Sequence, residues 1–132
     1  MEDLVMQLSE IFNNSTYKVD KREYCIAKVD SSYNDGDCFM VTKDELETTI
    51  ICENSLLKDG YIEARRNYRL IALNVAIPFD SPGFIAAISG KMALKGIPVL
   101  VLSTYSRDYF LIQDRMLREA IWILDELGIK RV

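Results

Sequence analysis

The sequence predicts an α+β protein, because helix-spaced and strand-like apolar segments are interleaved along a chain of 132 residues. Hydrophobic residues make up 49% of the chain, which is enough to bury a core and excludes a largely disordered protein. The C-terminal half carries two helical patterns between short strands, whereas the N-terminal half consists mostly of short strands and turns. A chain of this length fits one ordinary domain or two very small ones.

The N-terminal half is predicted to contain one helix followed by strands. Apolar residues recur at helical spacing over residues 2–12, and the polar run Asn13-Asn14-Ser15 ends this helix. Strands are then expected at four apolar runs, which are residues 17–19, 24–29, 38–41 and 48–52. Between these strands the polar, turn-forming residues of 31–37 and 53–60 predict loops.

The C-terminal half begins with a strand predicted over residues 68–77. In the helix that follows, Ser81 is expected to cap the N-terminus and Pro82 to occupy the first helical position. Phe84, Ile85, Ile88 and Met92 then fall on one face of this helix. Gly96 is expected to end it, since glycine favours the position after a helix C-terminus.

The remaining elements are a hairpin, a helix and a short strand. The hairpin joins strands at residues 98–102 and 108–112, and Asp114 is expected to cap a helix over residues 115–127. A last strand follows at residues 130–132. The order from the strand at 68–77 onward is that of a ferredoxin-like βαββαβ unit.

The strand-rich N-terminal half can supply a shorter version of the same unit. We therefore predict two ferredoxin-like units, of which the N-terminal one is abbreviated. The expected division is an N-terminal helix at residues 1–15, an N-terminal unit at 16–63 and a C-terminal domain at 64–132.

Composition excludes several classes of function. The net charge is −4 and no basic stripe occurs, so we expect no nucleic-acid partner. No apolar run reaches the roughly 18 residues of a membrane span, and the acidic start Met1-Glu2-Asp3 lacks the basic region of a signal peptide. These features predict a cytoplasmic protein without a membrane partner.

The reactive residues argue against an enzyme. The chain contains no histidine, which removes Ser-His-Asp and Cys-His chemistry and most zinc sites. The three cysteines, Cys25, Cys38 and Cys52, lie in strand-like segments and are predicted to be buried free thiols. We expect no catalytic residues, no metal and no cofactor.

Two predicted loops carry the polar groups of a candidate binding site. One loop, which contains Asp80 and Gly83, leads into a helix N-terminus, where free backbone N–H groups favour a carboxylate. The other loop, residues 103–108, contains Asp108, which is suited to an ammonium group, as is Asp80. Together these features describe a receptor for an α-amino acid. The alternative is that Ser81 only caps the helix and that Asp108 only pairs with Arg107 or with turn N–H groups.

The residues from 75 to 113, VAIPFDSPGFIAAISGKMALKGIPVLVLSTYSRDYFLIQ, resemble the ACT domain. The resemblance is to an ACT-like branch with the hairpin pattern S-T-Y-x-x-D-Y, which is related to aspartate kinase regulatory domains and to cytosolic arginine sensors. Residues 42–52, TKDELETTIIC, resemble the matching N-terminal segment of small proteins of that branch.

This resemblance implies two ACT-type units packed side by side, with an amino acid bound between them. Carried over by position, the implied ligand-binding residues are Asp80, Ser81, Pro82, Gly83, Ser103, Thr104, Tyr105 and Asp108, together with backbone groups at Thr49 and Ile50. In this arrangement Tyr105 forms a wall and Asp108 holds the ammonium group. Residues 84–88 include no carboxylate for a guanidinium, so a neutral or apolar amino acid is favoured over arginine.

Two functions remain open from the sequence. The first is a small stand-alone regulatory protein that binds an amino acid and acts as an allosteric sensor of a regulated enzyme. The second is a structural or interaction module that forms homo-oligomers, such as a homodimer, through ACT-type sheets or helices without a small ligand. Trp122, on the last predicted helix, belongs either to the core or to such an interface.

Overall fold

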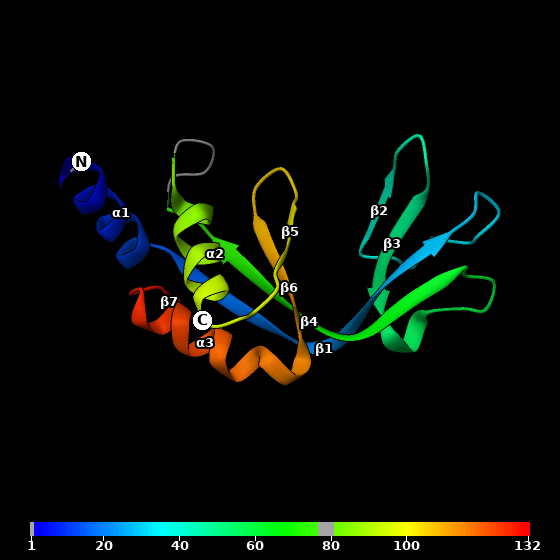
Figure 1. Ribbon diagram of the computed structural model, residues 1–132. Coiled ribbons are helices and arrows are strands. Elements are labelled where there is room, and N and C mark those ends of the chain that lie inside the picture. The colour runs from blue at the N-terminus through cyan, green and yellow to red at the C-terminus, as the bar shows by residue number, and fades with distance from the viewer. Residues whose placement is uncertain (1, 77–80) are drawn as a thin grey trace. The chain divides into compact units, whose positions relative to one another are not determined.

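The computed structural model describes residues 2–76 and 81–132, which form helices, strands and two single 3₁₀ turns (Figure 1). The helices are α1 (Glu2–Asn14), α2 (Phe84–Leu94) and α3 (Leu117–Glu126). The strands are β1 (Thr16–Val29), β2 (Met40–Lys43), β3 (Thr48–Glu53), β4 (Glu63–Asn74), β5 (Leu100–Ser103), β6 (Asp108–Gln113) and β7 (Lys130–Arg131). The 3₁₀ turns are η1 (Asn54–Leu56) and η2 (Asp114–Met116). The predicted α+β class is confirmed.

The chain forms two compact units. Unit 1 contains residues 1–20 and 69–132, and unit 2 contains residues 21–68. The long strands β1 and β4 contribute to both units, because the boundaries fall inside them. The domain boundary that we predicted between residues 63 and 64 stays a prediction.

Unit 1 has the predicted ferredoxin-like order of elements, β4-α2-β5-β6-α3-β7. Its strands are arranged in the order β7-β1-β4-β6-β5, so that the start of β1 lies between β7 and β4. β7 pairs in parallel with β1, where Thr16 lies opposite Lys130. β5 and β6 form the predicted hairpin, which is antiparallel.

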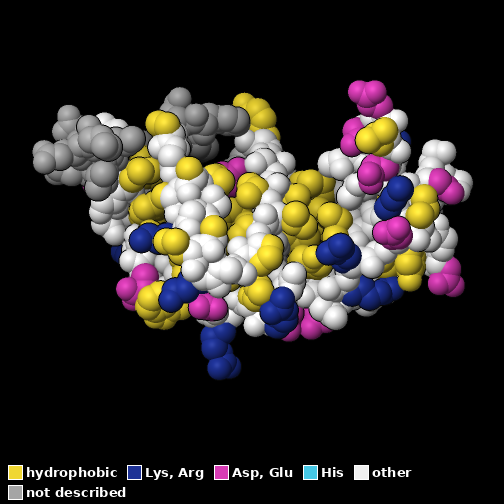
Figure 2. Space-filling view, viewed as in Figure 1, with side chains coloured by type: hydrophobic (Ala, Val, Ile, Leu, Met, Phe, Trp, Pro, Cys, Tyr) yellow, Lys and Arg dark blue, Asp and Glu magenta, His cyan; other side chains and the backbone are white. Residues whose placement is uncertain are grey.

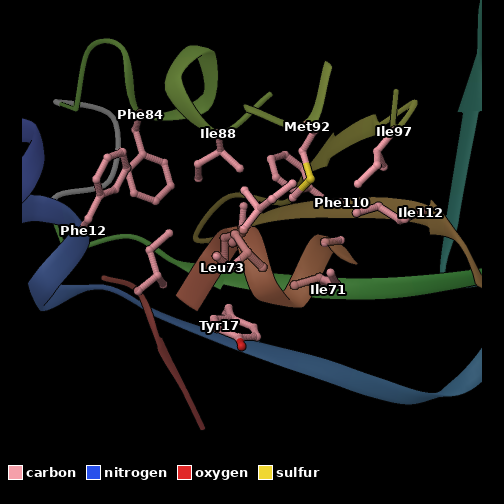
Figure 3. Close-up of a cluster of buried hydrophobic side chains, with 14 of the residues drawn as sticks. Phe12, Tyr17, Ile71, Leu73, Phe84, Ile88, Met92, Ile97, Phe110 and Ile112 are labelled. Carbon is pink, nitrogen blue, oxygen red and sulfur yellow. The ribbon is translucent and has the colours of Figure 1, made fainter. Parts of the chain in front are cut away.

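The core of unit 1 lies between its sheet and its helices (Figure 3). Ile71 and Leu73 of β4 and Phe110 of β6 are fully buried there, against Ile88 of α2. α1 joins the same core through Phe12, whose ring centroid lies 5.3 Å from that of Phe84. Burying each such side chain contributes about 1.5–3 kcal/mol, so this core fixes the position of α2.

The start of α2 differs from the prediction. The N-cap residue is Gly83, at φ 85°, and no side chain forms a capping hydrogen bond. Instead, the N–H of Phe84 donates to the carbonyl of Ser81 at 3.2 Å, in a turn that contains Pro82. The predicted roles of Ser81 as cap and Pro82 as first helical residue are therefore wrong, because a left-handed residue starts this helix and glycine adopts that conformation easily.

The start of α3 also differs from the prediction. Asp114 does not cap it, because residues 114–116 form η2 and α3 begins at Leu117. The Asp114 carboxylate instead lies 3.2 Å from Nη1 of Arg69 on β4. At the end of α2, Gly96 has φ 69° and its N–H donates to the carbonyl of Ala93, so the prediction that Gly96 ends that helix is confirmed.

The observed strand boundaries differ most from the predicted ones in β1 and β4. One strand, Thr16–Val29, replaces the two predicted at residues 17–19 and 24–29. The charged residues Lys21, Arg22 and Glu23 interrupt the apolar pattern in the sequence, but they continue the strand with exposed side chains. β4 begins five residues earlier than predicted and ends at Asn74. The position of residue 77, the predicted end, lies outside the described residues.

Unit 2 is the abbreviated unit. Its strands have the order β2-β3-β1-β4, and its only helical segment is the single turn η1. β1 and β3 pair antiparallel, with Cys25 opposite Cys52. No helix covers the sheet of unit 2. One small cluster of its buried residues consists of Cys25, Ala27, Val29, Ile50 and Cys52, and Tyr24, Ile51 and Tyr68 are buried as well.

The three cysteines are free thiols of unit 2. The Sγ atoms of Cys25 and Cys52 lie 3.5 Å apart and both residues are buried, as predicted, whereas Cys38 is only partly buried. Burial raises the pKa of the Cys52 thiol, and it also raises the pKa of the Cys38 thiol. Since the thiolate is the reactive form, these two thiols are poor nucleophiles at neutral pH.

Within the part of the chain that the structure describes, no helix is long and apolar enough to cross a membrane.

Candidate ligand pocket in unit 1

A pocket of about 270 Å³ lies between the β5–β6 hairpin and the start of α2. The hairpin contributes six consecutive residues, 103–108, and the segment before and at the start of α2 contributes Ser81, Phe84 and Ile85, with Val75 completing the lining. All of these residues belong to unit 1. We call this cavity the unit 1 pocket.

Five of the predicted site residues line the unit 1 pocket. They are Ser81, Ser103, Thr104, Tyr105 and Asp108. They come from two segments more than twenty residues apart in the sequence, and the hairpin and α2 bring them together. The pocket is small compared with the 300–1,000 Å³ of drug-sized sites, so it suits a ligand of amino-acid size.

The hairpin loop explains how a polar cluster can join two apolar strands without glycine or proline. Ser103 and Asp108 are the last paired residues of β5 and β6, and four residues connect them. The N–H of Thr104 donates to the carbonyl of Arg107 at 2.9 Å, which closes the loop. This closure joins two backbone groups, so the loop needs neither glycine nor proline.

Asp108 is the acidic group of the pocket lining. It is partly buried, and its Oδ1 accepts a hydrogen bond from Ser103 Oγ at 2.7 Å. An ionised carboxylate offers about four acceptor positions, so Asp108 can accept further hydrogen bonds from a ligand. The serine hydroxyl orients this carboxylate at the start of β6.

The remaining lining is apolar or basic. Val75, Phe84 and Ile85 form an apolar surface, and Phe84 is almost completely buried. Arg107 also lines the pocket, directly beside Asp108 in the sequence. The sequence-based prediction missed Val75, Ser106 and Arg107 as pocket residues, and it considered Arg107 only as a partner of Asp108. The signal for Arg107 was its place in the four-residue loop, whose members all face the same cavity.

Other predicted site residues lie elsewhere. Pro82 and Gly83 do not line the pocket, and a Cβ atom at Gly83 would lie 3.5 Å from Cδ1 of Leu8. Thr49 and Ile50 belong to β3 of unit 2, where Ile50 is fully buried. Asp80 lies outside the described residues. The roles of these residues in ligand binding stay predictions.

The pocket lining provides recognition groups and few catalytic ones. Its residues include no histidine, lysine or cysteine, so neither Ser103 nor Ser106 has an imidazole or amine base there. A carboxylate, a guanidinium cation and an apolar surface are instead groups that can bind a small zwitterion. Residues 2–76 and 81–132 also contain no group of side chains arranged to hold a metal ion.

Comparisons with known proteins agree with the fold of unit 1. Residues 63–126 match the family model of the ACT domain, a segment that includes α2, the hairpin and α3. Among curated proteins, no sequence matches the chain.

Solved structures with the same fold cover nearly the whole chain. A Vibrio cholerae protein described as of unknown function and as a possible transport protein is 20% identical, with a TM-score of 0.81 over 95% of this chain and 98% of its own. An Agrobacterium tumefaciens protein is also 20% identical, with a TM-score of 0.77 over 90% of this chain and 92% of its own. The ligand-free regulatory subunit of aspartate kinase from Thermus thermophilus is 10% identical, with a TM-score of 0.61 over 84% of this chain and 95% of its own.

Proposed function

Because the chain is an ACT-like domain protein, we propose that it is a small regulatory protein that binds a free amino acid in the unit 1 pocket and has no catalytic activity of its own. One observation carries the proposal: a partly buried carboxylate, an arginine and an apolar surface line the same cavity of about 270 Å³. These are the three kinds of group that an amino acid requires. Similarity to the regulatory subunit of an aspartate kinase supports a regulatory role.

In the proposed complex the two charges of the amino acid are recognised separately. Asp108 receives the α-ammonium group, and its orientation is maintained by the hydrogen bond from Ser103. The α-carboxylate binds near the N-terminus of α2 or at Arg107, both of which are positive. Tyr105, which is 86% exposed at the loop tip, forms the outer wall.

The lining favours a ligand with a neutral or apolar side chain. A guanidinium ligand would need a carboxylate of its own, and Asp108 is the one acidic residue among those that line the pocket. In this proposal that residue is occupied by the ammonium group. Val75, Phe84 and Ile85 instead provide apolar contacts, so a branched or aromatic side chain gains the most on binding.

A thermal unfolding screen against the twenty common amino acids tests the proposal. A ligand at a hundredfold excess over its dissociation constant stabilises the folded state by about 2.7 kcal/mol, which raises the unfolding temperature by several degrees. We expect this shift with one or a few neutral amino acids. We expect it to be lost in Asp108→Asn and retained in Asp59→Asn, a matched change at an exposed residue of unit 2. The absence of a shift with all twenty would contradict amino-acid binding.

A second candidate function is an interaction module that binds no small ligand. The observation that favours it is the edge strand β5, where Leu100 and Val101 are 40% and 44% exposed. Exposed apolar edge strands can pair with another chain. Sedimentation of the unliganded protein tests this alternative, and a protein that stays monomeric at high concentration would exclude self-association through β5.

A further inference from the structure

All three cysteines of the chain belong to unit 2. Cys25 and Cys52 are buried members of one core cluster there, and Cys38 packs against the same cluster from a partly buried position. Cys52 is the fifth residue of β3, and the fifth residue of β6 in unit 1 is Ile112. The hairpin itself therefore does not require a thiol at this position. We call the three cysteine side chains the unit 2 thiol cluster.

Cys25 and Cys52 have the geometry of a pair that a disulfide can join. They lie directly opposite each other on the antiparallel strands β1 and β3, and their Sγ atoms are 3.5 Å apart. Residues in this register have Cα atoms about 4.5 or 5.5 Å apart, and both values lie within the range of about 4.4–6.8 Å found in disulfides. Rotation of the two side chains can therefore bring the sulfur atoms to the bonding distance of about 2.05 Å.

Cys38 connects this buried pair to solvent. Its thiol forms a hydrogen bond with the thiol of Cys52, and it is the one cysteine of the three that is not buried. Figure 2 shows acidic and basic side chains over β2 and β3, which form the surface of this part of unit 2. A small reagent in solution therefore reaches Cys38 first, and it reaches the pair through Cys38.

The surroundings of the thiols also determine the order in which they ionise. Burial raises the pKa of the Cys38 thiol, the hydrogen bond from Cys52 acts against this rise, and the carboxylates of Asp35 and Asp37 add smaller increases. For Cys52, burial and the hydrogen bond with Cys25 both raise the pKa, and the rise is larger. Since the thiolate is the nucleophile, Cys38 is the thiol of this pair that reacts first with an external disulfide, although slowly at neutral pH.

We propose that the unit 2 thiol cluster is a site of reversible thiol–disulfide exchange, at which a low-molecular-weight disulfide such as glutathione disulfide enters at Cys38 and oxidises Cys25 and Cys52 to a cross-strand disulfide. The proposal goes beyond the proposed function, because none of the three cysteines lines the unit 1 pocket. It concerns a covalent modification of unit 2 and does not depend on amino-acid binding.

The exchange proceeds in three steps that conserve atoms and electrons. The Cys38 thiolate attacks one sulfur of glutathione disulfide, which forms a mixed disulfide and releases one glutathione. The Cys52 sulfur then attacks the Cys38 sulfur, loses its proton and releases the second glutathione as a thiol. In the last step Cys25 attacks the Cys52 sulfur, and its proton passes to Cys38, which leaves as a free thiol. Overall, two cysteine sulfurs lose two electrons, and the small disulfide gains them to form two thiols.

Equilibration of the wild-type chain in buffers of increasing glutathione disulfide to glutathione ratio tests the proposal. Free thiols are then alkylated, and peptide mass spectrometry identifies the linked residues. We expect an intramolecular Cys25–Cys52 disulfide as the main oxidised product, with Cys38 alkylated, and a return to three thiols after addition of dithiothreitol. A mixed disulfide confined to Cys38, a Cys38–Cys52 disulfide as the main product, or no oxidation in excess glutathione disulfide would each overturn the proposal.

Two variants test the path of the exchange. Cys38→Ser should form the same Cys25–Cys52 disulfide at the same glutathione ratio, because an equilibrium does not depend on its path, but at least about tenfold more slowly than the wild type. Cys25→Ala should stop the exchange one step earlier and accumulate the Cys38–Cys52 disulfide. Equal rates in the wild type and Cys38→Ser would contradict entry at Cys38, as would a Cys25→Ala chain that forms no Cys38–Cys52 bond.

The pH dependence of the wild-type rate is a readout that needs no substitution. Initial oxidation should accelerate about tenfold per pH unit between about pH 7 and pH 8.5, because the thiolate fraction of Cys38 increases in that proportion below its pKa. Tyr33, which packs against the cluster, stays protonated in this range because burial raises its pKa. A rate that does not change with pH would contradict attack by the Cys38 thiolate.

Discussion

The two units contain the same hairpin, and only one of the two hairpins borders the candidate pocket. The hairpin of unit 2 comprises β2, β3 and η1, and that of unit 1 comprises β5, β6 and η2, at positions 60 residues apart (40 and 100, 48 and 108, 54 and 114). Both loops have four residues and close in the same way, through Asp44 N–H to Glu47 carbonyl at 3.1 Å and Thr104 N–H to Arg107 carbonyl at 2.9 Å. β3 and β6 also bury their residues in the same pattern.

The difference lies in where each hairpin places its carboxylate. In unit 2, Asp44 lies in the loop, and its Oδ1 accepts the N–H groups of Leu46 and Glu47, both at 2.8 Å. In unit 1, Thr104 occupies that place and the carboxylate belongs to Asp108, the first residue of β6, which lines the pocket with the start of α2. The two hairpins therefore share a backbone structure. The identity of the residues in and beside the loop decides whether an aspartate carboxylate stabilises the turn or lines a pocket.

The largest effect on stability is expected from substitutions in the strand that follows each loop, which is β6 in unit 1 and β3 in unit 2. Phe110 of β6 and Ile50 of β3 are equivalent in position and both are fully buried. We expect Phe110→Ala to lower the free energy of unfolding by about 3–5 kcal/mol, and Ile50→Val to lower it by about 0.5–1.5 kcal/mol. Urea unfolding followed by circular dichroism measures both. A loss well below about 3 kcal/mol in Phe110→Ala would contradict the place of that ring in the core of unit 1.

A smaller effect should distinguish the two loops by pH. The hydrogen bonds from the Glu47 and Leu46 N–H groups lower the pKa of Asp44. Because the folded pKa is below the unfolded value, the ionised carboxylate stabilises the fold at neutral pH, and this contribution is lost as the pH falls from the unfolded value near 3.9 through the folded one.

The variant Asp44→Asn isolates this contribution, since the amide keeps an acceptor oxygen but not the charge. We expect the wild type to unfold at a higher temperature than Asp44→Asn at pH 7, and the difference to shrink below about pH 4. Thermal unfolding at a series of pH values measures it. A difference that does not depend on pH would contradict the role of the charge.

The smallest effect on stability should come from placing an aspartate in the loop of unit 1, at the position that Asp44 occupies in unit 2. In Thr104→Asp, the new carboxylate can accept the loop N–H groups as Asp44 does in unit 2. We expect a change in stability below about 0.5 kcal/mol, together with a marked loss of affinity for any amino acid found in the screen, because a second acid next to the pocket disturbs its charge balance. Unchanged affinity would show that Thr104 lies outside the ligand contact.

Much of the candidate site could be predicted from local sequence. Ser103, Thr104, Tyr105 and Asp108 were implied by the resemblance of the hairpin to the ACT-like pattern S-T-Y-x-x-D-Y, and all four line the pocket. The start of α2 was predicted wrongly, since Ser81-Pro82 is a common helix start and nothing local shows that Gly83 would adopt a positive φ. Val75 was missed because only the folded unit brings it to the hairpin.

The arrangement of the units depends on long-range pairing and was harder to predict. Nothing near Thr16 indicates that it pairs with Lys130, more than a hundred residues later. The hairpin repeat was also not detectable as a sequence repeat, because the equivalent loops Asp44-Glu45-Leu46-Glu47 and Thr104-Tyr105-Ser106-Arg107 share no residue. What they share is loop length and the burial of the strand that follows, which a comparison of residue identities does not detect.

The composition of unit 1 from both ends of the chain has a consequence for biosynthesis. Unit 2 is made of the continuous segment 21–68, so all of its strands have left the ribosome while unit 1 is still incomplete. Residues 16 and 17 are synthesised before any part of unit 2, yet their partners on β7 follow more than a hundred residues later. We therefore expect the nascent chain to complete unit 2 first, while the start of β1 has to wait for β7. The large separation of these paired residues also favours slower formation of unit 1.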